Sequence, residues 1–217
     1  DALVATARQA NPRLRHAICI DSDDTPSPSL AAWIGDAPDH FDIAPADPND
    51  VVALFTTGGT TGLPKGVMQT HLFYENLVSS YLAMMPSDTP PRFLAAAPLT
   101  HATGLFCFPV FARAGTVFVI PAARPLAIAE AVTRYRITDT LLPPTVIYGL
   151  LAEPTIGDFD FSSMKYLWYG TAPMDPARVR EAIDVLGPCL VSGWGQSEAV
   201  MLTFLSSSDL VRDGRIH

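Results

Sequence analysis

The apolar residues of this chain fall into two alternating patterns, short continuous runs and stripes at helical spacing. Runs at 51–55, 92–97, 116–120, 139–142, 166–169 and 189–192 predict strands. Between several of them, apolar residues recur every three or four positions and predict helices. These stripes consist of Phe73, Leu77, Tyr81 and Met84; Ile128, Ala131, Val132 and Tyr135; and Val179, Ala182, Ile183 and Leu186.

Several helix boundaries also have sequence signals. Thr70 suits an N-cap, and Asp175-Pro176 combines a capping carboxylate with a proline in the first turn. Gly187-Pro188 ends that last helix. The alternation predicts an α/β fold with a mostly parallel sheet flanked by helices, in which ligands bind beyond the carboxyl ends of the strands.

The first fifty residues differ from the rest. We expect a helix end and then a strand at 16–20. Residues 21–50 contain eight aspartates and five prolines and predict a surface connection with one short helix near 30–34. We therefore divide the chain into an N-terminal segment with an acidic, proline-rich connection, 1–50, and a central α/β region, 51–217.

Composition and charge exclude some classes of protein. Hydrophobic residues make up 48% of the chain and charged residues 17%, enough for a sizeable core. A net charge of −8 argues against a nucleic-acid partner. Three cysteines without metal-ligand spacing predict free thiols in a reducing, cytoplasmic compartment. The longest apolar stretch, 104–123, contains Arg113 and two prolines and is a poor membrane span. From the first residues of this sequence we expect no signal peptide.

A glycine-rich loop carries the clearest chemical signal. Residues 57–67 read Thr-Gly-Gly-Thr-Thr-Gly-Leu-Pro-Lys-Gly-Val, after a predicted strand and, we expect, before a helix. Glycines let backbone N–H groups approach an anion, the threonines add hydroxyl donors, and Lys65 adds positive charge. The segment is not a Walker loop, because Pro64 precedes the lysine and Gly66 follows it. A kinase-type phosphate loop is therefore disfavoured.

This segment resembles the signature loop of adenylate-forming enzymes, which include acyl- and aryl-CoA synthetases, luciferases and peptide-synthetase adenylation domains. Gly58 stands where many members have serine. The resemblance implies that the loop binds the β- and γ-phosphates of ATP. The residues so implicated are Thr57, Gly58, Gly59, Thr60, Thr61, Gly62 and Lys65.

Three further segments resemble the family in the same order. Residues 98–104 resemble the segment whose histidine, here His101, lies near the acyl pocket. The resemblance assigns Gly170, Thr171, Ala172 and Pro173 to a turn beside adenine and the acyl group. Residues 193–198 resemble the family's aromatic-Gly-x-Thr-Glu motif. It implies an adenine and acyl site at Gly193, Trp194, Gly195 and Gln196, with Ser197 at the α-phosphate and Glu198 on Mg²⁺.

The resemblance implies an ATP-dependent acid–thiol ligase of fatty-acid metabolism, which activates a carboxylic acid as its acyl-adenylate and transfers it to CoA. Lys65, Ser197 and Glu198 are the expected catalytic residues. Two alternatives stay open: an adenylation domain that loads a carrier protein, and a truncated nucleotide-binding remnant. Small residues such as Gly170 and Gly193 leave room for a long or bulky acyl group.

The resemblance covers the middle of the family's large N-terminal domain. We find no ribose-binding Thr-Gly-Asp and no counterpart of the C-terminal domain with its catalytic lysine. We therefore expect the isolated chain to be inactive or nearly so.

Overall fold

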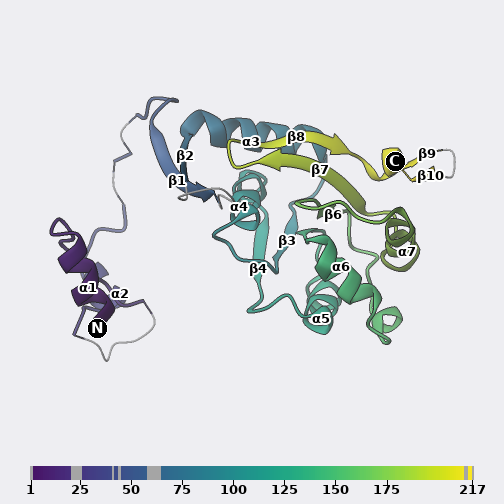
Figure 1. Ribbon diagram of the computed structural model, residues 1–217, viewed down its shortest axis with the longest axis horizontal. Coiled ribbons are helices and arrows are strands. Elements are labelled where there is room, and N and C mark those ends of the chain that lie inside the picture. The colour runs from purple at the N-terminus through teal and green to yellow at the C-terminus, as the bar shows by residue number, and fades with distance from the viewer. Residues whose placement is uncertain are drawn as a thin grey trace. The chain divides into compact units, whose positions relative to one another are not determined.

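The computed structural model describes residues 2–20, 26–40, 42–43, 45–57, 65–212 and 215–216. The chain forms two compact units, Asp1–Pro45 and Ala46–His217. The larger unit contains the central sheet and its flanking helices (Figure 1).

The N-terminal unit contains two helices, α1 (Ala2–Ala10) and α2 (Leu30–Ile34). The side chain of Ser29 caps α2 by accepting a hydrogen bond from the Ala32 amide, so the short helix expected here is confirmed. The strand expected at 16–20 is wrong, because only Cys19 forms a β-bridge there, with Ser29. The chain enters α2 directly after this bridge, which leaves no partner strand to extend the pairing.

The larger unit is built on a six-stranded sheet in the order β4-β3-β5-β6-β7-β8. The pairs among the first five strands are parallel, and only the edge strand β8 is antiparallel to its neighbour. The mostly parallel sheet is therefore confirmed. The strands are β3 (Arg92–Ala95), β4 (Thr116–Val119), β5 (Asp139–Leu141), β6 (Tyr166–Tyr169), β7 (Leu190–Gln196) and β8 (Ala199–Leu205).

Helices cover both faces of this sheet, and side chains alternate between two apolar clusters (Figure 1). In β3, Phe93 packs with α3 (His71–Met84) and α4 (Ala102–Ala112), whereas Leu94 packs on the opposite face. That second face is covered by α5 (Pro125–Tyr135), α6 (Pro144–Leu151) and α7 (Pro176–Leu186). Short elements complete the unit: η1 (Ile156–Asp158), α8 (Ser207–Leu210), β9 (Val211–Arg212) and β10 (Arg215–Ile216).

A buried hydrogen bond between Tyr81 and Asp139 links α3 to β5, beside the apolar cluster that contains Phe93. The hydroxyl of Tyr81 donates to Oδ1 of Asp139 at 3.2 Å, and Asp139 also accepts from the Thr138 hydroxyl. Arg113 donates to the carbonyl oxygen of Leu82 at 3.0 Å, near the C-terminus of α3. These contacts satisfy polar groups that would otherwise be buried without partners.

A separate antiparallel hairpin carries the glycine-rich loop. Its strands are β1 (Val51–Thr57) and β2 (Lys65–Thr70), with Thr57 opposite Lys65. The expected helix with Thr70 at its N-cap is confirmed, although β2, which the sequence did not predict, lies between the loop and this helix. Helix α3 begins only after Thr70, whose side chain accepts from the Phe73 amide. The loop residues Gly58, Gly59, Thr60, Thr61 and Gly62 lie outside the described residues.

Candidate nucleotide and acyl site

A cavity of about 720 Å³ lies at the carboxyl ends of β6 and β7, where an open α/β sheet binds its ligands. Its lining joins two sequence segments that were singled out separately. The turn after β6 contributes Gly170, Thr171, Ala172 and Pro173, and the end of β7 with the next turn contributes Gly193, Trp194, Gly195, Gln196 and Ser197.

The turn after β6 has a backbone shape that brings it close to β7. A Cβ atom on Gly170 would lie 2.8 Å from the carbonyl oxygen of Gly193, so glycine is required for this approach. Thr171 has a φ of 67°, a left-handed conformation that is uncommon for a threonine. The chain then enters α7, where the Asp175 side chain accepts from the Ala177 amide, as the Asp-Pro signal predicts.

Most of the Trp-Gly-Gln-Ser-Glu segment, 194–198, lies in a strand rather than in the turn that the sequence indicated. We expected a strand that ends at Ser192, whereas β7 continues to Gln196. Only Ser197 and Glu198 form the turn, and β8 follows at once with Ala199 opposite Gln196. The cause is the antiparallel pairing with β8, a strand that the sequence did not predict.

The side chains around this turn are open to a ligand. Trp194 is 59% exposed although it borders the cavity, and Glu198 is exposed on the turn. Ser197 is half-buried and lines the cavity. An exposed indole presents a face on which a purine can stack. A serine hydroxyl and a carboxylate beside it can meet a phosphate and a hard cation.

His101 lies at the N-cap position of α4, where its side chain makes no capping hydrogen bond. It is exposed, and the lining described here includes Ala102, Leu105 and Phe106 from this helix but not His101. The turn before the helix is tight, since a Cβ atom on Gly104 would lie 1.9 Å from the carbonyl oxygen of Leu99. The acyl-pocket role of His101 stays a prediction.

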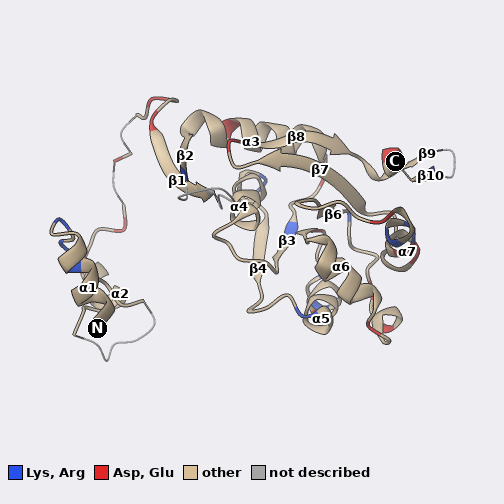
Figure 2. Cartoon of the chain, in the orientation of Figure 1, with Lys and Arg blue, Asp and Glu red and all other residues tan. Residues whose placement is uncertain are grey.

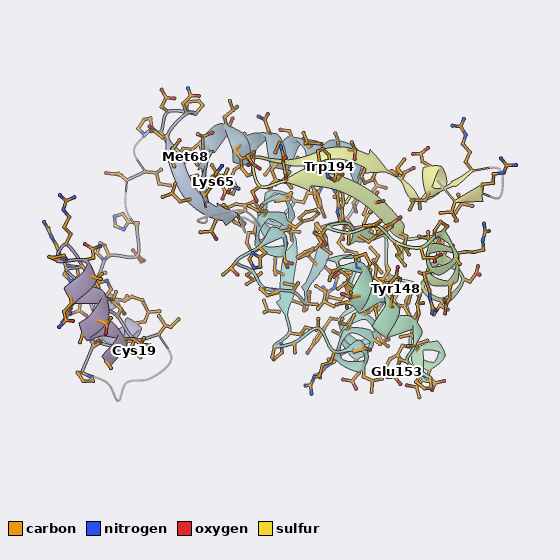
Figure 3. The ribbon with its side chains drawn as sticks, viewed as in Figure 1. Cys19, Lys65, Met68, Tyr148, Glu153 and Trp194 are labelled. Carbon is orange, nitrogen blue, oxygen red and sulfur yellow. The ribbon has the colours of Figure 1, made fainter. Side chains whose placement is uncertain are left out.

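Thr57 and Lys65 are the described residues that flank the glycine-rich loop, and they face each other across the hairpin. Phe55, two residues before Thr57, lines the cavity, so the hairpin reaches the same site. Figure 3 labels Lys65 on this hairpin and Trp194 on β7.

No residue that lines the described cavity carries a charge. The strands β6, β7 and β8 likewise contain no Lys, Arg, Asp or Glu (Figure 2). Sequence reasoning missed much of the apolar lining, which includes Phe55, Leu105, Phe106, Leu141, Trp168, Met174, Val200 and Met201. Such residues look like ordinary core in a sequence, so no signal there could have assigned them to a cavity.

The site offers one candidate protein ligand for magnesium, Glu198. Within the described ranges no three His, Cys, Asp or Glu side chains gather as metal ligands. Glu198 offers one exposed carboxylate, so a Mg²⁺ ion here would take its other ligands from phosphate oxygens and water, as this ion commonly does.

Among the helices that the structure describes, none has the length and apolarity needed to cross a membrane.

The sheet and its flanking helices have the fold of the N-terminal domain of an adenylate-forming enzyme. The chain matches the AMP-binding enzyme family over residues 2–216 and belongs to that family.

Curated relatives agree with this assignment. The chain is 37% identical over 163 residues to a medium/long-chain-fatty-acid–CoA ligase of Mycobacterium tuberculosis, covering 75% of this chain and 28% of the relative. It is 35% identical over 157 residues to a feruloyl-CoA synthase of Amycolatopsis, covering 71% and 32%. The chain thus spans about a third of the length of these relatives.

Solved structures share the fold. An amide bond synthetase from Marinactinospora thermotolerans superposes with a TM-score of 0.83 at 28% identity, over 97% of this chain and 42% of that chain. MbtA from Mycobacterium smegmatis superposes with a TM-score of 0.81 at 22% identity, over 97% and 39%. The expected α/β fold of the family's N-terminal domain is confirmed.

Proposed function

We propose that this chain forms the nucleotide- and acyl-binding region of an ATP-dependent acid–CoA ligase. The observation that carries the proposal is the cavity. The two segments that resemble the family, 170–173 and 193–197, both line it, and no charged residue does. The relatives that are named as fatty-acid and feruloyl CoA ligases support it.

The proposed reaction has two steps. A carboxylate oxygen of the acid attacks the α-phosphorus of ATP, and the bond to the bridging oxygen of pyrophosphate breaks. The sulfur of CoA, having lost its proton, then attacks the acyl carbon, and the carbon–oxygen bond to AMP breaks. The products are acyl-CoA, AMP and pyrophosphate.

We assign each candidate site residue a role in this reaction. Trp194 stacks on adenine, with Gly170, Thr171, Ala172 and Pro173 opposite it. Ser197 donates to the α-phosphate, and Lys65 with the loop at 57–62 neutralises the β- and γ-phosphates. Glu198 would hold Mg²⁺, which would supply positive charge to offset the negative charge of the phosphates.

The lining also indicates the class of acid. A second carboxylate or an ammonium group on the substrate would lose its hydration without gaining an opposite charge. We therefore propose a monocarboxylic acid with an apolar aliphatic or aromatic body. This argues against amino acids, and so against an adenylation domain that loads an amino acid onto a carrier protein.

The test uses the full-length gene product with ATP, Mg²⁺ and a panel of acids. We expect AMP and pyrophosphate to form with fatty acids or hydroxycinnamic acids when CoA is present, and not with amino acids or dicarboxylic acids. ADP as product would reject adenylation, and transfer to a carrier protein but not to CoA would favour the loading domain. ATP binding without turnover would indicate a non-catalytic remnant.

A second test addresses Glu198. Glu198→Ala should lower acid-dependent pyrophosphate exchange by about a hundredfold and raise the Mg²⁺ concentration required. Glu130→Ala, which removes an exposed carboxylate from α5, is the matched control and should exchange at the wild-type rate. Unchanged exchange in Glu198→Ala would remove this residue from its assigned role.

A further inference from the structure

A fully buried glutamine connects the phosphate-loop hairpin to the turn that bears Ser197 and Glu198. Gln69, on β2, is 0% exposed. Its Nε2 donates to the backbone carbonyl oxygen of Ser197 at 3.0 Å, across 128 positions of sequence. Tyr74, on α3, donates from its hydroxyl to Oε1 of Gln69 at 2.9 Å.

The chemistry of the partners determines how this amide is oriented. A backbone carbonyl can only accept, so the atom that faces Ser197 must be the amide nitrogen. The amide oxygen then faces Tyr74, whose hydroxyl must donate. Burial raises the pKa of Tyr74, which keeps this hydroxyl protonated.

The tyrosine is itself held by packing. Its ring lies 4.7 Å from the ring of Phe108, on α4, and 5.2 Å from that of Phe73. The three groups, Tyr74, Gln69 and the Ser197 carbonyl, therefore form one directed chain of hydrogen bonds from helix α3 through β2 to the turn. We call this chain the Gln69–Tyr74 link.

The link joins the two parts of the proposed site that we assign to opposite ends of the ATP triphosphate. The hairpin of Gln69 also carries Thr57 and Lys65, which flank the phosphate loop. The turn carries Ser197 and Glu198, and two residues are all that connect β7 to β8 there. The hydrogen bond from Gln69 to the Ser197 carbonyl helps to fix the distance between the backbone of the hairpin and the backbone of the turn.

We propose that Gln69 and Tyr74 are positioning residues that hold the Ser197–Glu198 turn at the distance from the phosphate loop that adenylation requires. This inference rests on the proposed function. Neither side chain needs to touch the substrate. The link acts through the Ser197 carbonyl, and a displacement of about 1 Å at a reacting group can lower a rate about a hundredfold.

The experiment uses Gln69→Leu, Gln69→Glu and Tyr74→Phe in the full-length gene product. Leucine removes both hydrogen bonds. Burial raises the pKa of a glutamate at this position, and its protonated form can still donate to Ser197, so this variant is assayed above that pKa, where the ionised carboxylate accepts from Tyr74 but cannot donate. We expect both Gln69 variants to lose about 10- to 100-fold in kcat for pyrophosphate exchange, with the KM for ATP changed by less than about threefold. Tyr74→Phe should lose less, because the amide can still reach the carbonyl.

Ile147→Val is the control for a purely structural effect. Ile147 is 0% exposed on α6, in the apolar cluster on the other face of the sheet. This variant should lower the thermal midpoint and leave kcat unchanged. If it lowers kcat as much as Gln69→Leu at equal loss of stability, the positioning role is rejected.

Hydrogen–deuterium exchange provides a readout that does not depend on activity. In Gln69→Leu and Gln69→Glu, the amides of residues 197–199 should exchange at least about tenfold faster than in the wild type and in Ile147→Val. Unchanged exchange at the turn overturns the proposal, and so does faster exchange with an unaltered kcat. If the wild-type protein exchanges no pyrophosphate with any acid, the proposed function fails, and with it the link's role in adenylation. The turn's exchange then shows separately whether the link holds it in place.

Discussion

The indole ring of Trp168 lies so close to the α-carbon of Gly193 that a Cβ atom there would stand 2.0 Å from Cζ2 of the ring. The two residues lie on the neighbouring strands β6 and β7, and both border the cavity. Trp168 is held in this position by Phe106 at 5.2 Å and Phe204 at 5.6 Å between ring centroids. The absence of a side chain at 193 thus allows an indole to form part of the cavity wall.

Gly193→Ala should therefore move Trp168. We expect a loss of roughly 1–3 kcal/mol in the free energy of unfolding, because a packed ring must shift. We also expect a rise of about tenfold in KM for the larger acids and less for the smaller ones. Denaturant unfolding and steady-state kinetics measure the two effects. Gly157→Ala, where an added Cβ meets no atom within 4 Å, is the matched control and should change neither.

Gly104→Ala should destabilise the protein through the backbone rather than through the cavity. The new Cβ atom would meet the carbonyl oxygen of Leu99 at 1.9 Å, so the first turn of α4 must move. We expect a loss of roughly 2–3 kcal/mol in unfolding free energy. Gly149→Ala, in α6, meets only a Pro125 side-chain atom at 3.4 Å and should be neutral or slightly stabilising. Equal stabilities for the two variants would contradict the tight turn.

Asp139 should make the stability depend on pH. Burial raises the pKa of this carboxyl above its ordinary 3.8, in spite of hydrogen bonds from Thr138 and Tyr81 that lower it. Folding therefore favours the protonated carboxyl. The resulting stabilisation of the folded protein is complete below pH 3.8 and is lost as pH rises through the folded-state pKa.

Asp139→Asn removes this titration and keeps an oxygen that can accept from Tyr81. We expect a flatter dependence of unfolding free energy on pH above 3.8, and a gain of roughly 1 kcal/mol at neutral pH. Urea unfolding across the pH range measures this. Asp184→Asn, in α7 outside the buried group, is the control and should retain the wild-type slope. A steeper slope in Asp139→Asn would contradict the assignment.

Trp194 should contribute to nucleotide binding by stacking. Trp194→Ala is expected to weaken AMP binding by up to about tenfold, and Trp194→Phe by less than about threefold, because a phenyl ring still offers a face. Isothermal titration measures both. Trp33→Ala, in the N-terminal unit, is the control for an exposed tryptophan and should bind AMP as the wild type does. Wild-type affinity in Trp194→Ala would reject stacking at this position.

Local patterns predicted much of the secondary structure. The stripes led to α3, α5 and α7, and the apolar runs led to β1 and β3 to β7. Helix α4 was missed because it is apolar on every side and contains Pro109, so it shows no stripe. Helix α6 was missed because Pro143-Pro144 indicated only the end of a strand, whereas Pro144 also suits the first turn of a helix. Strands β2 and β8 were missed because each is defined by its antiparallel partner.

The sequence by itself determined the alternation of strands β3 to β7 with helices α5 and α7, the glycine-rich loop and the membership of the family, since these depend on local spacing and on residue type. The tertiary structure alone decided which apolar core residues, such as Phe106 and Trp168, also line the cavity. It also decided that Gln69 meets the Ser197 carbonyl, across 128 positions of sequence. Local periodicity reports which face of a helix or strand is buried, whereas contacts between distant residues depend on strand order and on how helices pack against the sheet.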